Sequence, residues 1–345
     1  MALKDVIGQD RALRILLKTL ERGRIPSSYL FAGETGIGKR MTATNLAKAL
    51  NCLAARGHDH QTPSFDCCDE CDSCRKIESN THPDFRLIVP ENGQIRIEEI
   101  REIDEVLSLK AFEGRYKVIM VDDAETMNQY AANAFLKILE EPPADSLILL
   151  ISSNPERLPD TIRSRCSRIN FMPLPLDACE EVIRRGIVPA SERSDQESGE
   201  AAETSAGRSH RDSLVRLAMG KPGTALTEDP VAQRNRFIEQ LEDMRHMGKD
   251  TWASREEMER WFEFVLVLLR DMAVVKILPD EQHLINPDMK EYIVRAGNAM
   301  NIKGIIELYY RLNTLKKHCY FNLNKSLTWN FTGSLLRKDI GEPYA

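Results

Sequence analysis

The sequence predicts an α/β fold with a parallel sheet in its first half and a wholly helical region from about residue 230 onward. In the first half, short apolar runs typical of buried strands alternate with segments whose apolar residues recur at helical spacing. Such alternation predicts parallel strands with helices on both faces of the sheet. With 345 residues the chain is too long for one compact core, so we expect two or three domains.

The elements of the first half follow in order. Residues 10–21 predict a helix, and the apolar run 29–32 predicts a strand that leads into a glycine-rich loop. The segment 39–51 then has apolar residues on one helical face. Further strands are predicted at 85–89, 116–121 and 147–151, and further helices at 95–109 and 126–141, the last ending at Pro142 and Pro143.

The second half begins with a change of composition. Small, polar and charged residues dominate 191–212, which cannot bury enough apolar surface to offset its ordering entropy. We therefore predict a flexible insertion at about 190–212 inside a small helical domain that ends at Gly220–Gly223. Apolar stripes at Trp261–Leu269 and Ile305–Leu315 indicate a helical core or an inter-subunit surface.

Composition excludes several functional classes. Apolar residues make up 42% of the chain and charged residues 29%, as in ordinary soluble proteins. The net charge of −6 gives no global basic signature, so contact with DNA would depend on a local patch or on partners. No apolar run reaches membrane-spanning length, and the first residues lack the apolar core of a signal peptide. We expect a cytoplasmic protein without membrane contacts.

The segment 33–40 matches a phosphate-binding loop at seven of its eight positions. Its glycines let backbone N–H groups surround phosphate oxygens, and Lys39 would reach the outer phosphates. The last position normally carries a hydroxyl that binds Mg²⁺, whereas Arg40 cannot coordinate a cation. The nucleotide-binding residues expected here are Gly33, Gly36, Gly38, Lys39 and Arg40.

An acidic strand accompanies this loop. The predicted strand 116–121 ends at Asp122 and Asp123. In a working site Asp122 would hold the Mg²⁺ shell, and a following glutamate would orient the attacking water. Asp123 is one methylene shorter, and misplacing a catalytic group by about 1 Å can cost on the order of 10²-fold in rate. We therefore expect hydrolysis to be weak or absent.

Five of the eight cysteines lie between positions 52 and 74. In a reducing cytosol such clustering favours metal binding over disulfides. The spacing of Cys68, Cys71 and Cys74, with Cys52 upstream, predicts a closed four-thiolate site for structural Zn²⁺. Two alternatives stay open: Cys67 in place of Cys68, and His58 or His60 in place of Cys52.

An arginine follows the last predicted strand of the α/β region, in Ser164-Arg165-Cys166. A surface arginine at this position suits insertion into a neighbour's nucleotide site, where it would offset charge developing on a γ-phosphate. From chemistry alone, a surface salt bridge is the first choice for Arg165.

Several motifs occur in the order found in one family. They are Val6–Gln9, the glycine loop, the cysteine cluster, Asp122–Asp123, Leu136–Pro143 and Ser164–Cys166. Together they resemble the bacterial DNA polymerase III clamp-loader subunits, a branch of the AAA+ ATPases. The resemblance is dense over residues 5–175. The segments Leu136–Pro143 and Ser164–Cys166 are highly specific to this branch.

Within this family the chain resembles the delta-prime branch more than the tau/gamma motor, which hydrolyses ATP. The motor has Thr or Ser where Arg40 stands, Asp-Glu where Asp122-Asp123 stands, and a sensor arginine within the segment that matches Gly220–Gly223. A motor that hydrolyses ATP itself is the alternative. A zinc- or redox-centred regulator built on the cysteines is a third hypothesis.

The resemblance implies an AAA+ core over 1–172 with a zinc module at 52–74, a helical lid over 173–228 and a helical collar over 229–345. It implies a five-subunit ring with tau/gamma and delta subunits that loads the sliding clamp onto primer–template DNA in replication. The chain would have no polymerase chemistry of its own. Implied cofactors are structural Zn²⁺ and, if nucleotide binding is retained, ATP or ADP, with Mg²⁺ disfavoured.

The resemblance also assigns roles to individual residues. Arg165 would reach the ATP of an adjacent tau/gamma subunit. Val6, Ile7 and Gly8 would lie by the adenine pocket, and Ser153 would occupy the first sensor position, where Thr is usual. Arg96, at the start of a helix facing the ring's interior, would contact a DNA phosphate.

Overall fold

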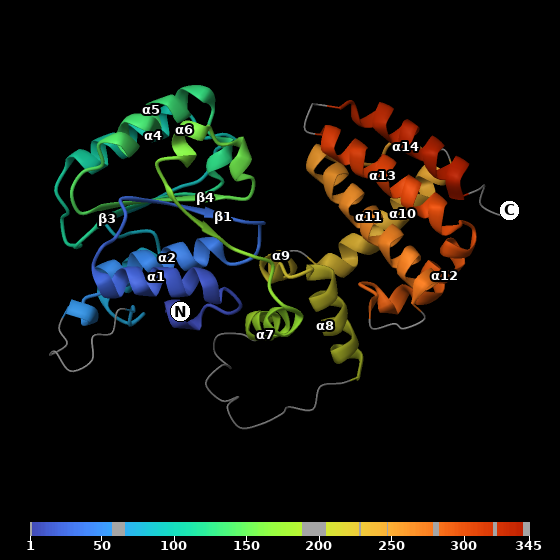
Figure 1. The fold of residues 1–345 in the computed structure, drawn as a ribbon, viewed down its shortest axis with the longest axis horizontal. Coiled ribbons are helices and arrows are strands. Elements are labelled where there is room, and N and C mark those ends of the chain that lie inside the picture. Colours follow the sequence, from blue (N-terminus) through green and yellow to red (C-terminus); the bar gives the residue numbers. More distant parts are fainter. Residues whose placement is uncertain are drawn as a thin grey trace. The chain divides into compact units, whose positions relative to one another are not determined.

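A computed structural model describes residues 2–56, 66–187, 205–227, 229–246, 248–278, 283–319 and 323–340 (Figure 1). The chain divides into two compact units. Unit 1 consists of residues 1–185 with 220–224. Unit 2 consists of residues 186–219 with 225–345.

A five-stranded parallel sheet forms the centre of unit 1, in the order β2–β3–β4–β1–β5. The central strands β1, β3 and β4 are buried along their whole length, as their continuous apolar runs predict. The strands are β1 (Ser28–Ala32), β2 (Phe85–Ile88), β3 (Lys117–Val121), β4 (Ser146–Ser152) and β5 (Ser167–Asn170).

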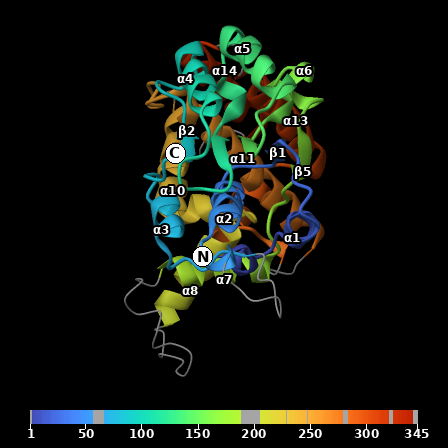
Figure 2. The same ribbon diagram turned by 90° about the vertical axis from the view of Figure 1, so that its left-hand side faces the viewer.

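Helices cover both faces of this sheet. In the two views, α1 and α2 lie on one face, and α4 and α5 lie on the other (Figures 1 and 2). The helices of unit 1 include α1 (Asp10–Arg22), α2 (Lys39–Asn51), α3 (Asp72–Glu78), α4 (Ile97–Ser108), α5 (Gln129–Glu140), α6 (Asp160–Arg163) and α7 (Leu176–Ile187). The predicted α/β class, with a parallel sheet between two helical layers, is confirmed.

The carboxyl ends of three adjacent strands meet at one edge of the sheet. β1 leads into Gly33, β3 into Asp122 and β4 into Ser153. The N–H of Gly33 donates to the carbonyl of Ser152 at 3.2 Å, which joins two of these ends directly. Ligand sites of open parallel sheets lie at such an edge, so the fold brings the predicted nucleotide-site residues together.

The described residues of unit 2 form helices joined by loops, without strands, as the sequence predicts. Its core is a large apolar cluster in which Trp252 contacts both Trp261 and Trp329, with ring centroids 5.5 and 5.0 Å apart. The helices that follow α7 are α8 (Ser205–Ala218), α9 (Pro222–Thr227, which bridges the two units in sequence), α10 (Pro230–Arg245), α11 (Arg255–Ile277), α12 (Lys290–Asn298), α13 (Ile302–Cys319) and α14 (Lys325–Ile340).

The segment 190–212, predicted as a flexible insertion, lies only partly within the described residues. Helix α8 begins at Ser205, so the last part of that segment is helical. The physical reason is the apolar anchor that follows, because Leu214, Val215 and Ala218 are buried and hold the helix in place. Among the described residues, no helix has both the length and the apolar character that crossing a membrane requires.

Candidate functional sites

The glycine loop joins β1 to α2, and its backbone explains its composition. Gly36 and Gly38 have φ angles of 79° and 97°, in the left-handed region that disfavours other residues. Lys39 begins α2 and is buried, and its ammonium donates to the carbonyls of Gly33 and Glu34 at 2.6 Å each. Burial lowers the pKa of Lys39, although the nearby carboxylates Asp122 and Glu125 oppose that shift. The lysine is therefore satisfied by its own loop.

Arg40 contacts the carboxylate that a magnesium shell would use. Its guanidinium lies 3.4 Å from Asp122, whose side chain is 16% exposed. Asp123 has a left-handed backbone with φ of 46°, and burial together with the charges of Asp122 and Glu125 raises its pKa. The arginine thus supplies a fixed positive charge where the phosphate-loop motif places a hydroxyl and a cation.

Glu125 is a site residue that the sequence reasoning missed. One of its oxygens accepts hydrogen bonds from the N–H and hydroxyl of Ser153, at 2.9 and 2.5 Å, and from the N–H of Asn154 at 2.9 Å. Burial raises the pKa of Glu125, but these donors outweigh it and lower the pKa. Ser153, the predicted first-sensor residue, is therefore tied to a carboxylate of the same chain. A third acidic residue soon after Asp122-Asp123 was the available signal.

The segment Gly220–Gly223 closes directly onto the glycine loop. The N–H of Gly223 donates to the carbonyl of Gly36 at 2.9 Å, and Lys221 pairs with Glu34 at 3.1 Å. A Cβ atom at Gly36 would lie only 2.8 Å from the side chain of Thr224. Glycine at both positions permits this close backbone contact between the segment and the loop.

The segment Val6–Gln9 lies beside the same loop. The side chain of Gln9 donates to the carbonyls of Ile37 and Met172 at 3.1 and 2.7 Å, which connects this segment to the glycine loop and to the end of the α/β region. A Cβ at Gly8 would clash with Leu174, at 2.7 Å. Val6, Ile7 and Gly8 are thus placed next to the predicted nucleotide site. Their contact with adenine stays a prediction.

The four predicted zinc ligands come together. The Sγ atoms of Cys52, Cys68, Cys71 and Cys74 all lie within 4.8 Å of one another, and those of Cys52 and Cys68 are 3.6 Å apart. A tetrahedral Zn²⁺ with Zn–S bonds of about 2.3 Å requires sulfur–sulfur distances of roughly 3.8 Å, so this cluster fits such a metal. Although burial raises the pKa of Cys71, N–H donors from Cys74 and Leu53 outweigh it and lower the pKa to about 6.

Geometry favours Cys68 over Cys67 as the fourth ligand of the predicted site. Cys68 belongs to the cluster, whereas the Cys67 thiol faces Asp69 at 3.8 Å. Burial and the charges of Asp69 and Asp66 raise the pKa of Cys67 to about 12, which keeps it a neutral thiol. His58 and His60 lie outside the described residues.

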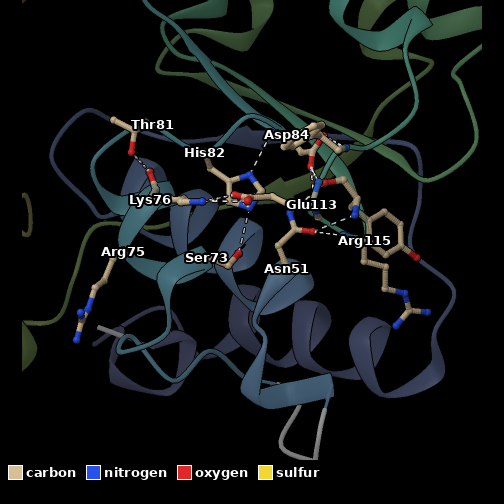
Figure 3. Close-up of polar contacts among 12 residues, drawn as sticks. Asn51, Ser73, Arg75, Lys76, Thr81, His82, Asp84, Glu113 and Arg115 are labelled. Carbon is tan, nitrogen blue, oxygen red and sulfur yellow. Dashed lines mark hydrogen bonds and ion pairs between the residues drawn. The ribbon is translucent and has the colours of Figure 1, made fainter.

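A polar network connects the cysteine module to the sheet (Figure 3). Ser73, beside Cys74 on α3, contacts the Nε2 of buried His82 at 3.2 Å. Asp84 then accepts the N–H groups of Phe112, Glu113 and Gly114, at 2.7, 2.8 and 2.6 Å. The side-chain oxygen of Asn51, at the end of α2, accepts the N–H groups of Arg115 and Tyr116, just before β3 begins. These buried groups fix the connection between α4 and β3.

Arg165 lies at the surface after α6. Its Nη2 contacts Glu140 at 2.6 Å and its Nη1 donates to the carbonyl of Thr161 at 2.9 Å, while the side chain remains 36% exposed. The neighbouring Arg163 instead pairs with Glu156 and Asp160. Arg96 is exposed at the N-terminal cap of α4. Its predicted DNA contact, like the trans-acting role of Arg165, stays a prediction.

Comparison with known proteins agrees with this architecture. A family model described as DNA polymerase III, delta subunit, matches residues 8–175. The delta-prime subunit of Bacillus subtilis is 27% identical over 332 residues, 92% of each chain. The tau subunit of Salmonella typhimurium is 36% identical over 173 residues, which are half of this chain and 26% of that one. The delta-prime subunit of Pseudomonas aeruginosa is 32% identical over 290 residues, 80% of each chain, and the chain therefore belongs to the family of DNA polymerase III delta-prime subunits.

Proposed function

We propose that this chain is the delta-prime subunit of a clamp loader that helps place the sliding clamp on primed DNA. In this role Arg165 acts in trans on the ATP of a neighbouring tau/gamma-type subunit. The observation that carries the proposal is that the Arg165 guanidinium is both oriented by neighbouring groups and accessible at the surface. It is held by Glu140 and Thr161, yet more than a third of the side chain remains accessible to a partner.

The chain's own nucleotide site supports a partner role over a motor role. Lys39 is engaged by loop carbonyls, Arg40 by Asp122, and Gly36 by Gly223. A phosphate chain would compete with the loop carbonyls for Lys39, and Mg²⁺ would have to compete with Arg40 for Asp122. We infer that intrinsic hydrolysis is weak or absent and that any nucleotide binding is independent of Mg²⁺.

A motor that hydrolyses ATP itself is the second candidate. It is favoured by the intact loop from Gly33 to Lys39 and by Asp122 at the end of β3. Purified chain that hydrolyses ATP, with activity abolished by Lys39→Ala, would establish it. The hypothesis of a redox regulator is tested by metal analysis and thiol titration. Tightly held Zn²⁺ without a reversible disulfide would rule it out.

The proposal includes the remaining predicted features. The cysteine cluster holds structural Zn²⁺, which supplies a crosslink between the end of α2 and the start of α3. Residues 1–172 act as the core, 173–228 as a lid and 229–345 as a collar that contacts tau/gamma and delta subunits. The sliding clamp and primer–template DNA are engaged through the complex.

The experiment that tests this function is Arg165→Ala in a complex reconstituted with tau/gamma-type and delta-type subunits. An arginine finger contributes about 10³- to 10⁵-fold at the site it serves, so hydrolysis at one ATPase site should be nearly lost in single-turnover measurements. Arg168→Ala is the matched control, because Arg168 pairs with Glu156 at 3.3 Å on the same surface. Unchanged hydrolysis in the Arg165 variant would contradict the proposal.

A further inference from the structure

We propose that Glu140 is a positioning residue, which holds the Arg165 guanidinium in the orientation that a neighbour's ATP requires. The inference rests on the proposed trans-acting role of Arg165 and extends it to a second side chain. Glu140 lies in Leu136–Pro143, a segment to which the family resemblance assigns no chemical role.

The contacts around Arg165 orient its guanidinium but use only some of its hydrogen-bond donors. Glu140 takes one donor at 2.6 Å and the Thr161 carbonyl another at 2.9 Å. A guanidinium carries five N–H donors, so three remain for an incoming phosphate. The backbone is held as well, because the Ser28 hydroxyl donates to the Arg165 carbonyl at 2.8 Å. A partner therefore meets a charged group whose direction is already set.

Both supports of the guanidinium belong to helices that are anchored in the core. Glu140 is the last residue of α5, which Pro142 and Pro143 prevent from continuing, and the preceding Ile138 and Leu139 are buried. Thr161 is on α6, and the adjacent Ile162 is fully buried. Because neither support is on a loose loop, less rotamer freedom of Arg165 is lost when it engages a ligand.

Electrostatic attraction favours the ion pair between Glu140 and Arg165. A carboxylate at the C-terminal end of a helix faces the negative end of the helix dipole, and Glu141 adds a like charge beside it. The positive charge of Arg165 offsets this repulsion. On the same surface Arg163 is committed to Glu156 and Asp160, so the charge of Glu140 acts on Arg165.

The test compares Glu140→Ala, Glu140→Gln and Glu141→Ala in the reconstituted complex. Small misplacements of a reacting group cost up to about 10²-fold, so we expect Glu140→Ala to lower the clamp- and DNA-stimulated kcat roughly tenfold, with KM for ATP unchanged. Glu140→Gln keeps an acceptor oxygen and should recover part of the rate. Glu141 is exposed and adjacent, so Glu141→Ala should leave kcat unchanged. Equal melting temperatures of the variants establish that each chain is folded.

The double variant Arg165→Ala/Glu140→Ala separates the two ideas. If Glu140 acts through Arg165, the double variant is no slower than Arg165→Ala alone. A normal kcat for Glu140→Ala beside a slow Arg165→Ala overturns the positioning role and leaves the proposed function intact. Additive losses overturn it as well, because they mean that Glu140 acts elsewhere. A normal kcat for Arg165→Ala overturns the proposed function and the positioning role together.

Discussion

Replacing Asp84 with alanine should destabilise unit 1 and release the connection between α4 and β3. The carboxylate is buried and accepts three backbone N–H groups, at 2.6 to 2.8 Å. A hydrogen bond to a charged group contributes about 1.5–3 kcal/mol, so three bonds give a gross value of roughly 4.5–9 kcal/mol. Because such bonds are not additive and losses above about 5 kcal/mol are exceptional, we expect a loss of about 3–5 kcal/mol.

The same carboxylate predicts a direction for pH dependence. Burial raises the pKa of Asp84, but the N–H groups of Gly114, Phe112 and Glu113 outweigh it and lower the pKa. A group with a lowered folded pKa stabilises the protein fully above its unfolded value, about 3.9 for Asp. That stabilisation is lost as the pH falls through the folded pKa. The difference between wild type and Asp84→Ala should therefore shrink below about pH 4.

Urea unfolding at pH 7 and amide hydrogen exchange measure the effect of Asp84→Ala together. The amides of Phe112, Glu113 and Gly114 should lose protection, because they lose their acceptor. Asp104→Ala, an exposed residue of α4, is the control and should stay within about 0.5 kcal/mol of wild type. A loss below about 1 kcal/mol with these amides still protected would refute the reasoning.

Two further predictions concern the cysteine and nucleotide sites. Cys68→Ser should remove tightly bound Zn²⁺ from the purified chain, whereas Cys67→Ser should retain it, because of these two residues only Cys68 lies in the sulfur cluster. Metal analysis of the two purified variants checks this, and equal zinc contents would contradict the ligand set. Arg40→Thr restores a hydroxyl and frees Asp122, so nucleotide affinity should become Mg²⁺-dependent by roughly tenfold, or about 1.4 kcal/mol, in titrations with and without Mg²⁺. An affinity that ignores Mg²⁺ in that variant would show that Arg40 is not what excludes the cation.

The fold could be predicted where burial is continuous and not where it is partial. The runs that became β1, β3 and β4 are apolar throughout, and α2 occupies the predicted residues 39–51. β5 was missed because Ile169 alone of its four residues is buried, which leaves no apolar run to detect. α6 spans only Asp160–Arg163, too short for a helical period to appear.

The candidate sites divide in the same way between local and distant signals. The glycine loop and the Cys68–Cys74 spacing each lie within a short stretch of the chain, so both can be recognised in the sequence. The contact between Gly36 and Gly223 joins positions far apart in the chain, and only folding reveals it. The pairing of Glu140 with Arg165 likewise depends on α5 and α6 being neighbours in the fold. Neither the Leu136–Pro143 motif nor the Ser164–Cys166 motif predicts this contact by itself.

Helix α2 gives a physical reason for the cysteine cluster to persist in a chain whose own hydrolysis we infer to be weak. The helix begins at Lys39 in the glycine loop, and Cys52 caps its other end. Near that end, buried Lys48 pairs with Asp69 of the cysteine loop and with Glu78 of α3. Burial lowers the pKa of Lys48, but these two carboxylates outweigh it and raise the pKa, so the lysine stays charged. A metal at the four sulfurs would therefore fix one end of the helix that carries the glycine loop at the other. On this reasoning a metal at the cluster stabilises the α/β unit that also contains Arg165, and its removal should lower the stability of that unit before it alters any chemistry.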